Sequence, residues 1–163
     1  MTTAFYDPGT NALYSDSQTC MGAMRYSTAV RKITLVPHPD LGTCIAVGAG
    51  ARCYVDAVFK AISVEKAMPN IPSDEHVSIM LLTADGKVYE ASSPDMYLAA
   101  TDDSSAFNAI GSGTPFAHAA YLATGCPVKT MDIVKQLDIY SGGATVKGYF
   151  DKSGYPVIED LTS

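Results

Sequence analysis

The first three residues, Met1-Thr2-Thr3, could form the nucleophile of a hydrolase. Removal of an initiator methionine, which is usual before a small residue, would leave Thr2 with a free amine beside its own hydroxyl. The amine could then accept the hydroxyl proton, which is the threonine version of the nucleophile–base pair. An α-amine with a pKa near ~8 is partly neutral at physiological pH, so it suits this role with little tuning. Because many proteins begin with Met-Thr, this start gains meaning only from groups downstream that could serve it.

Five downstream residues could serve such a nucleophile. Lys32 lies at the start of a β-branched stretch, and Asp16 lies between two serines in a predicted strand, where aspartate is uncommon. Ser112 lies between two glycines. Asp138 lies near the end of a predicted helix, where the helix dipole disfavours a carboxylate, and Ser141 follows it. Each also has an ordinary interpretation, as a solvated lysine, a turn residue or a helix stop.

The composition indicates one globular domain, which we expect to span residues 1–163. The chain has 163 residues, of which 47 % are hydrophobic and 17 % charged, enough for one sizeable core. A net charge of −6 argues against a protein that binds nucleic acid or a membrane surface.

The cysteines give no sign of a metal or redox motif. Neither C-x-x-C spacing nor a histidine at ligand spacing occurs among them, so we expect no required cofactor and no metal site. The N-terminus has no signal-peptide pattern, which predicts a cytoplasmic location and reduced thiols. The four positions are Cys20, Cys44, Cys53 and Cys126.

The stretch from Ser104 to Val128 contains no Asp, Glu, Lys or Arg. Three glycines and two prolines interrupt it, so it is not a membrane span. We expect it to be deeply buried or to lie at a subunit contact.

The elements that position these residues follow from periodicity and turn residues. Asp85-Gly86 between two apolar runs predicts a hairpin. Thr114-Pro115 has the N-cap and first-position pattern of a helix, with Gly125 as its stop. The segment 19–28 is ambiguous. Strands are predicted at residues 2–6, 12–17, 30–36, 44–48, 77–82, 88–91, 106–110, 142–150 and 156–158, and helices at 50–62, 114–124 and 127–140. This order predicts an α+β fold with helices layered on antiparallel sheets.

Together these segments resemble the proteasome β-subunit and HslV family of threonine peptidases. The resemblance covers residues 2 to about 150, with the motifs in the family's order. Serines flank Asp16 where HslV has glycines, which is closer to the proteasome and to the related protein Anbu. The matching segments are Met1-Thr2-Thr3, Tyr14–Thr19, Val30–Ile33, Ala46–Gly50, Ala109–Ala117 and Asp138–Gly143.

The resemblance implies a four-layer αββα sandwich of the N-terminal-nucleophile hydrolase type. It also implies that Thr2 is the nucleophile, with its amine as general base. Lys32 would lower the pKa of the Thr2 hydroxyl, and Asp16 would orient Lys32 and keep it charged. Ser112, Asp138 and Ser141 would surround the amine.

The resemblance further implies how substrate is held. A backbone amide near Gly48 would stabilise the oxyanion. Val47 would lie near the floor of the first specificity pocket, which predicts apolar side chains in substrates. The family also leaves open a monovalent cation near Asp138 and Ser141.

The expected function is therefore that of a self-compartmentalised threonine endopeptidase. The expected partners are other copies in a homo-oligomeric ring, a hexamer or heptamer that could stack, an ATP-dependent unfoldase, and protein or peptide substrates. One alternative is a non-catalytic scaffold or binding subunit that retains Met1, although a scaffold would have no evident reason to keep a lysine and two carboxylates in this arrangement. The other alternative is an amidase of the same type acting on small amides.

Overall fold

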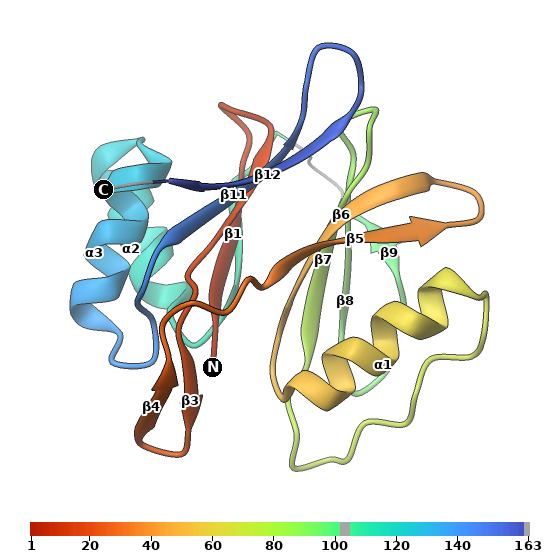
Figure 1. The fold of residues 1–163 in the computed structure, drawn as a ribbon, viewed down its shortest axis with the longest axis horizontal. Helices are drawn as coiled ribbons and strands as arrows, with labels where there is room; N and C mark the ends of the chain where they lie inside the picture. The colour runs from red at the N-terminus through yellow and green to blue at the C-terminus, as the bar shows by residue number, and fades with distance from the viewer. Residues whose placement is uncertain (102–104, 162–163) are drawn as a thin grey trace.

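A computed structural model describes residues 1–101 and 105–161 and has a mixed α+β fold. The described part contains two five-stranded antiparallel sheets, a two-stranded hairpin and three helices (Figure 1). Ser104, where the uncharged stretch begins, and residues 162–163 lie outside the described residues.

The first sheet carries the N-terminus in its interior. Thr3 pairs with Gly111 on one side, and Ala4 pairs with Ser15 on the other. This register places Thr2 beside the Gly-Ser-Gly turn and close to Asp16. The strand order is β10 (Asn108–Gly111), β1 (Thr3–Asp7), β2 (Ala12–Ser15), β11 (Thr145–Phe150) and β12 (Pro156–Leu161).

The second sheet faces the first across a shared apolar core. Along β6, Ile45, Val47 and Ala49 point into this core, whereas Cys44 and Ala46 point to the opposite face, as strand alternation requires. The strand order is β5 (Ile33–His38), β6 (Gly42–Ala49), β7 (Ser78–Leu82), β8 (Val88–Ser92) and β9 (Ala99–Ala100).

Helices cover the other face of each sheet. Helix α1 (Arg52–Ser63) packs on the second sheet with an apolar stripe that includes Val55, Val58 and Phe59. Helices α2 (Thr114–Thr124) and α3 (Pro127–Leu137) pack on the first sheet (Figure 1).

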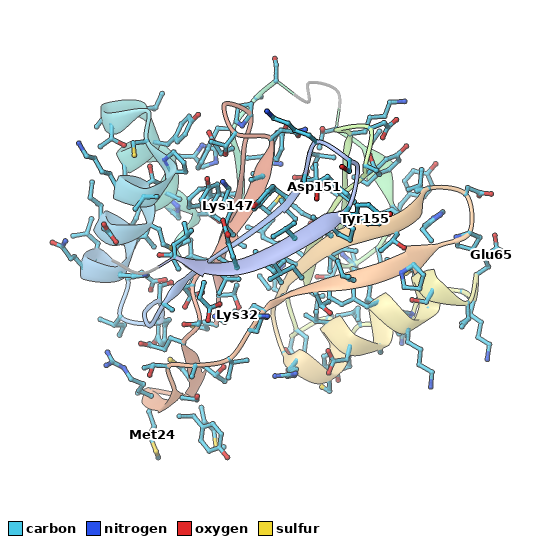
Figure 2. All side chains as sticks on the ribbon, turned by 45° about the horizontal axis from the view of Figure 1, so that its top comes forward. Met24, Lys32, Glu65, Lys147, Asp151 and Tyr155 are labelled. Atoms are coloured by element: carbon cyan, nitrogen blue, oxygen red, sulfur yellow. The ribbon has the colours of Figure 1, made fainter. Side chains whose placement is uncertain are left out.

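The hairpin of β3 (Thr19–Met21) and β4 (Met24–Ser27) extends from the body near the N-terminus (Figure 1). Figure 2 shows Met24 at its tip, where the side chain points away from the molecule. The hairpin occupies the segment that the sequence left ambiguous.

Several predicted element boundaries were wrong. Thr114 is not the N-cap of α2, because its hydroxyl donates to the Gly111 carbonyl and Gly113 takes the cap position. Strand β5 continues through Pro37 to His38, and α3 ends at Leu137 because Asp138 is already extended.

The uncharged stretch is not deeply buried in its described part. Helix α2 buries only Ala117 and Ala120, and Leu122 is 86 % exposed. The prediction of deep burial was therefore wrong, whereas a subunit contact stays a prediction. Within the described part of the chain, no helix is both long and apolar enough to cross a membrane.

Candidate active site

Asp16 is the centre of a buried hydrogen-bond network. It follows β2 directly, and its side chain is fully buried. One carboxylate oxygen, Oδ1, accepts from the Thr3 amide at 3.0 Å and from Lys32 Nζ at 2.7 Å. The other, Oδ2, accepts from the amides of Gln18 and Gly142, both at 3.1 Å. Four donors from separate parts of the chain therefore hold this carboxylate in one orientation.

Lys32 lies between Asp16 and the N-terminus. Its side chain is 9 % exposed, and Nζ donates to the Met1 carbonyl at 2.9 Å as well as to Asp16. Burial lowers the pKa of Lys32 below its ordinary value, while the negative charge of Asp16 acts in the opposite direction. The ammonium group thus stands directly beside the peptide bond that joins Met1 to Thr2.

Thr2 is nearly buried, at 6 % exposure, and lines a pocket. Its carbonyl accepts from the Ser112 amide at 2.9 Å, which fixes its backbone. Among residues 1–101 and 105–161, no side chain or backbone group hydrogen-bonds to the Thr2 hydroxyl. The Thr2 hydroxyl therefore contributes no hydrogen bond to the fold within the described residues.

The Gly111-Ser112-Gly113 turn is shaped around Thr2 and Thr3. Gly111 has φ +96°, and a β-carbon there would lie 1.7 Å from the Thr2 carbonyl oxygen. A β-carbon at Gly113 would lie 2.0 Å from Thr3 Oγ1. Both positions require glycine because the N-terminal strand occupies the space that a side chain would need.

Asp138 forms a second acidic group on the other side of the N-terminal strand. Its Oδ2 accepts from Ser112 Oγ at 2.8 Å and from Ser141 Oγ at 2.7 Å. Thr3 Oγ1 lies 2.6 Å from Ser141 Oγ and 3.4 Å from Asp138 Oδ2. The three residues predicted to cluster, Ser112, Asp138 and Ser141, are therefore together.

Gly142 and Gly143 pack against the segment that follows Asp16. A β-carbon at Gly142 would lie 2.4 Å from Gln18 Oε1, and one at Gly143 would lie 2.4 Å from Ser17 Oγ. The Gln18 side-chain amide donates to the Ile139 carbonyl at 2.9 Å. These contacts tie the loop that carries Ser141 to the segment that carries Asp16.

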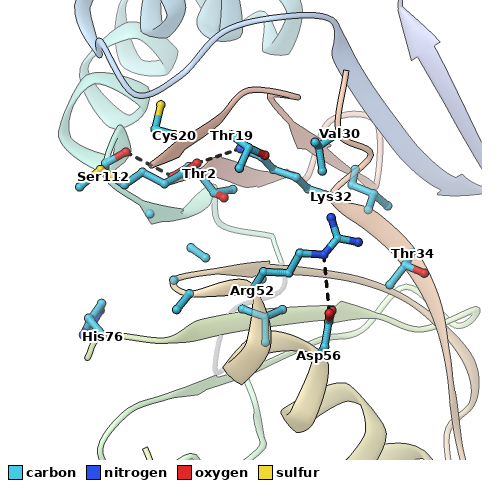
Figure 3. Close-up of a pocket in the computed structure, with 18 of the residues that line it drawn as sticks. Thr2, Thr19, Cys20, Val30, Lys32, Thr34, Arg52, Asp56, His76 and Ser112 are labelled. Carbon is cyan, nitrogen blue, oxygen red and sulfur yellow. Dashed lines mark hydrogen bonds and ion pairs between the residues drawn. The ribbon is translucent and has the colours of Figure 1, made fainter. Parts of the chain in front are cut away.

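The pocket beside Thr2 has a volume of about 890 Å³. Its lining includes the apolar side chains Val30, Val55 and Phe59 together with charged side chains. Arg52 and Asp56 form an exposed ion pair at 3.6 Å. Figure 3 shows Thr2, Cys20, Lys32 and Ser112 on one side of the pocket and Arg52, Asp56 and His76 on the other.

The structure places Gly48 on the pocket wall with Ala49 and Gly50, but it does not place Val47 there. Val47 is fully buried in the core between the two sheets. Placing Val47 at the pocket floor was wrong, because strand alternation directs its side chain away from the helix that borders the pocket. Val55 of α1 takes a place in the lining instead.

Sequence reasoning assigned no role to Thr3, Gln18 or Cys20, although all three lie within this network. Cys20 lines the pocket, and its sulfur accepts from the Gln18 side-chain amide at 3.2 Å. Thr3 and Gln18 lie within the matching motifs. Thr3 follows Thr2 directly and Gln18 lies two residues after Asp16, and this closeness in sequence was the available sign that they belong to the site.

No protein-family model matches this chain, and a comparison with curated proteins found no match. Within the described residues, no group of three or more His, Cys, Asp or Glu side chains could hold a metal ion. The side-chain oxygen of Gln18 is buried near Gly142, and no group in the described part of the chain donates a hydrogen bond to it. A monovalent cation near Asp138 and Ser141 stays a prediction.

Proposed function

We propose that this protein is a threonine endopeptidase in which Thr2 is the nucleophile after Met1 is removed. Residues 1–163 would form one domain, and its two sheets and flanking helices would be the four-layer αββα sandwich of N-terminal-nucleophile hydrolases. The order of the layers supports this, since one core lies between the sheets and each outer face is covered by helix.

One observation carries the proposal: Lys32 Nζ lies 2.7 Å from buried Asp16 and 2.9 Å from the Met1 carbonyl. This geometry holds a positive charge beside the residue whose hydroxyl and nitrogen would react. A cation at that point would stabilise the developing alkoxide of Thr2, and Asp16 would keep the cation oriented.

In the proposed reaction, Thr2 Oγ1 attacks the carbonyl carbon of a peptide bond while its proton passes to the Thr2 amine. The new C–O bond gives a tetrahedral oxyanion, for which the Gly48 amide is the proposed donor, a kind of contact worth roughly 3–4 kcal/mol in other hydrolases. Collapse breaks the C–N bond, and the Thr2 ammonium gives its proton to the departing amine. Water then attacks the ester carbon and gives a proton to the Thr2 amine. The C–O bond to Thr2 breaks, the ammonium returns that proton to Oγ1, and the carboxylic acid product leaves.

With Met1 in place this reaction has no base, because the Thr2 nitrogen is part of a peptide bond. An amide nitrogen does not accept a proton near neutral pH, whereas an α-amine with a pKa near ~8 does. Ser112, Asp138 and Ser141 are proposed to set the hydrogen bonding of that amine. The apolar part of the pocket, including Val55 and Phe59, favours peptides with apolar side chains.

The proposed assembly is a homo-oligomeric ring fed by an ATP-dependent unfoldase, in the cytoplasm. The exposed apolar side chains on α2 and α3, among them Phe116, Leu122 and Val128, support a contact between copies.

The testing experiment measures intact mass and peptide hydrolysis on the same sample. Protein lacking Met1 is expected to hydrolyse a fluorogenic peptide amide that ends in leucine, and Thr2→Ala is expected to abolish the activity with assembly intact. Thr2→Ser, which keeps a hydroxyl, is the matched control and is expected to retain activity. Full activity in Thr2→Ala would overturn the mechanism.

A second candidate function is a non-catalytic scaffold or binding subunit that keeps Met1. The buried contacts of the site favour it, because Asp16 and Asp138 hold the chain together through hydrogen bonds that need no catalytic activity. A purified sample that retains Met1 and hydrolyses neither peptides nor small amides would support this function. Hydrolysis of small amides alone would instead indicate an amidase.

A further inference from the structure

We propose that Thr3 is a positioning residue for the nucleophile, joining the Asp16 group and the Asp138 group through its backbone and its hydroxyl. This inference rests on the proposed function of Thr2. Thr3 is fully buried and does not line the pocket, so it would act through its neighbours and not on substrate directly.

The backbone amide and the backbone carbonyl of Thr3 both form hydrogen bonds with Asp16. Its amide donates to Asp16 Oδ1 at 3.0 Å, and its carbonyl accepts from the Asp16 amide at 3.1 Å. The same carboxylate oxygen accepts from Lys32. The peptide bond between Thr2 and Thr3 is therefore held in register with the lysine that would assist the nucleophile.

The side chain of Thr3 is bound to the other acidic group, and proton counting fixes its direction. Ser141 Oγ has one proton, which it donates to Asp138 Oδ2 at 2.7 Å. The 2.6 Å contact between Thr3 Oγ1 and Ser141 Oγ must then use the Thr3 proton. Thr3 thus donates to Ser141, which donates to Asp138, in one chain of hydrogen bonds that reinforce each other.

The Thr3 side chain also has little freedom to turn. A β-carbon at Gly113 would lie 2.0 Å from Thr3 Oγ1 and 3.0 Å from Thr3 Cβ, so the backbone of that turn encloses the hydroxyl. The neighbouring residue of the turn, Ser112, donates its amide to the Thr2 carbonyl. Because Thr3 is joined covalently to Thr2, fixing both ends of Thr3 limits how Thr2 can rotate.

The test compares Thr3→Ser with Thr3→Ala, since both lose the methyl group and they differ only in the hydroxyl. Steady-state hydrolysis of the leucine peptide amide is measured on protein whose intact mass confirms removal of Met1. Thr3→Ala is expected to lower kcat by about 10- to 100-fold with KM changed by less than about twofold, as for a misplaced reacting group. Thr3→Ser, which keeps the hydroxyl, is expected to retain most of the kcat that Thr3→Ala loses.

A double-mutant cycle with Ser141→Ala tests the route of the effect. If Thr3 acts through Ser141, Thr3→Ala is expected to lower kcat much less in the Ser141→Ala background than in the wild type. Should Thr3→Ala give no folded protein, Thr3→Cys takes its place, because a thiol is a weaker donor. Its kcat is expected to lie below that of Thr3→Ser.

Three outcomes would overturn the role of Thr3 while leaving Thr2 as nucleophile. These are equal activity in Thr3→Ala and the wild type, equal losses in Thr3→Ala and Thr3→Ser, and additive effects in the cycle. Failure of the proposed function itself looks different. The Met1-free wild type would then not hydrolyse the peptide, or Thr2→Ala would retain activity, and the inference about Thr3 would fall with it.

Discussion

The Thr2 carbonyl oxygen occupies the place where a side chain at Gly111 would begin. A β-carbon at Gly111 would lie 1.7 Å from that oxygen, and the backbone there has φ +96°. The next residue, Ser112, donates its amide to the same oxygen at 2.9 Å. The turn and the N-terminus therefore fit each other through backbone atoms, which cannot move aside as a flexible side chain could.

Gly111→Ala is therefore expected to be strongly destabilising. The positive φ costs about 1–2 kcal/mol for an L-residue, and forced repacking adds about 1–3 kcal/mol. Gly154→Ala is the matched control, since Gly154 has φ +83° and no described residue has an atom within 4 Å of a β-carbon there, so only the first cost applies. Chemical denaturation of both variants measures the difference. Equal free energies of unfolding would show that the N-terminal strand can shift away from the turn.

Asp16→Asn is expected to lower the free energy of unfolding by about 3–5 kcal/mol, the cost of leaving a buried charge unpaired. An asparagine has one carbonyl oxygen, so whichever way its amide turns, the two donors at the other position face an NH₂ group. The control is Asp160→Asn, which breaks the exposed Arg31–Asp160 pair and is expected to cost about 0–1 kcal/mol. Similar losses in the two variants would contradict the burial argument.

Lys32 gives a prediction about pH. Its folded pKa is lowered by burial, so the folded chain releases this proton at a lower pH than the unfolded chain does. Its contribution to stability therefore rises with pH between the folded pKa and the ordinary lysine value of 10.5. If the charge of Lys32 assists Thr2, kcat/KM is expected to fall as pH rises through the folded pKa, below 10.5.

Lys32→Arg provides the control for that pH profile. A guanidinium stays protonated throughout the accessible pH range, so the fall in kcat/KM at alkaline pH is expected to disappear even where the overall rate is lower. An unchanged alkaline fall in Lys32→Arg would show that another group titrates there.

Tyr121 gives a prediction away from the pocket. Its hydroxyl on α2 donates to Asp7 Oδ1 at 2.6 Å, and this hydrogen bond raises the pKa of Tyr121 to about 12. Because the folded pKa is raised, the stability that this contact adds is present below pH ~10 and is lost as pH rises towards 12. An absorbance titration should show a smaller phenolate phase near pH 12 in Tyr121→Phe than in the wild type, since burial also raises the pKa values of Tyr6 and Tyr14. An unchanged amplitude of that phase in the variant would contradict the assignment.

Much of the fold could be predicted from local patterns. The Asp85-Gly86 hairpin, the apolar stripe of α1 and the stop at Gly125, which has φ +58°, all depend on neighbours in sequence. The errors arose where a contact of the folded chain overrode a local sequence pattern. Thr114 matched an N-cap pattern, but the Gly111 carbonyl took its hydroxyl.

In the candidate site, too, some residues follow from local motifs and others depend on contacts in the folded chain. Asp16 and Lys32 are paired, and Ser112, Asp138 and Ser141 are clustered, as the motifs predict. Val47 was assigned to the wrong face of its strand, because a shift of one residue in register moves each side chain to the opposite face of the sheet. Thr3 and Gln18 were overlooked because their roles depend on partners more than 100 residues away along the chain.

The hydrogen bonds of the site also bear on how related chains would diverge. Asp16, Lys32, Ser112, Asp138 and Ser141 all hold buried contacts, so selection for stability alone would retain them in a chain that had lost its activity. The sequence-based argument that a scaffold would have no reason to keep this lysine and these carboxylates is therefore wrong. The Thr2 hydroxyl forms no hydrogen bond within residues 1–101 and 105–161, so hydrogen bonding in the fold gives no reason to preserve it. An inactive descendant is expected to change first at residue 2.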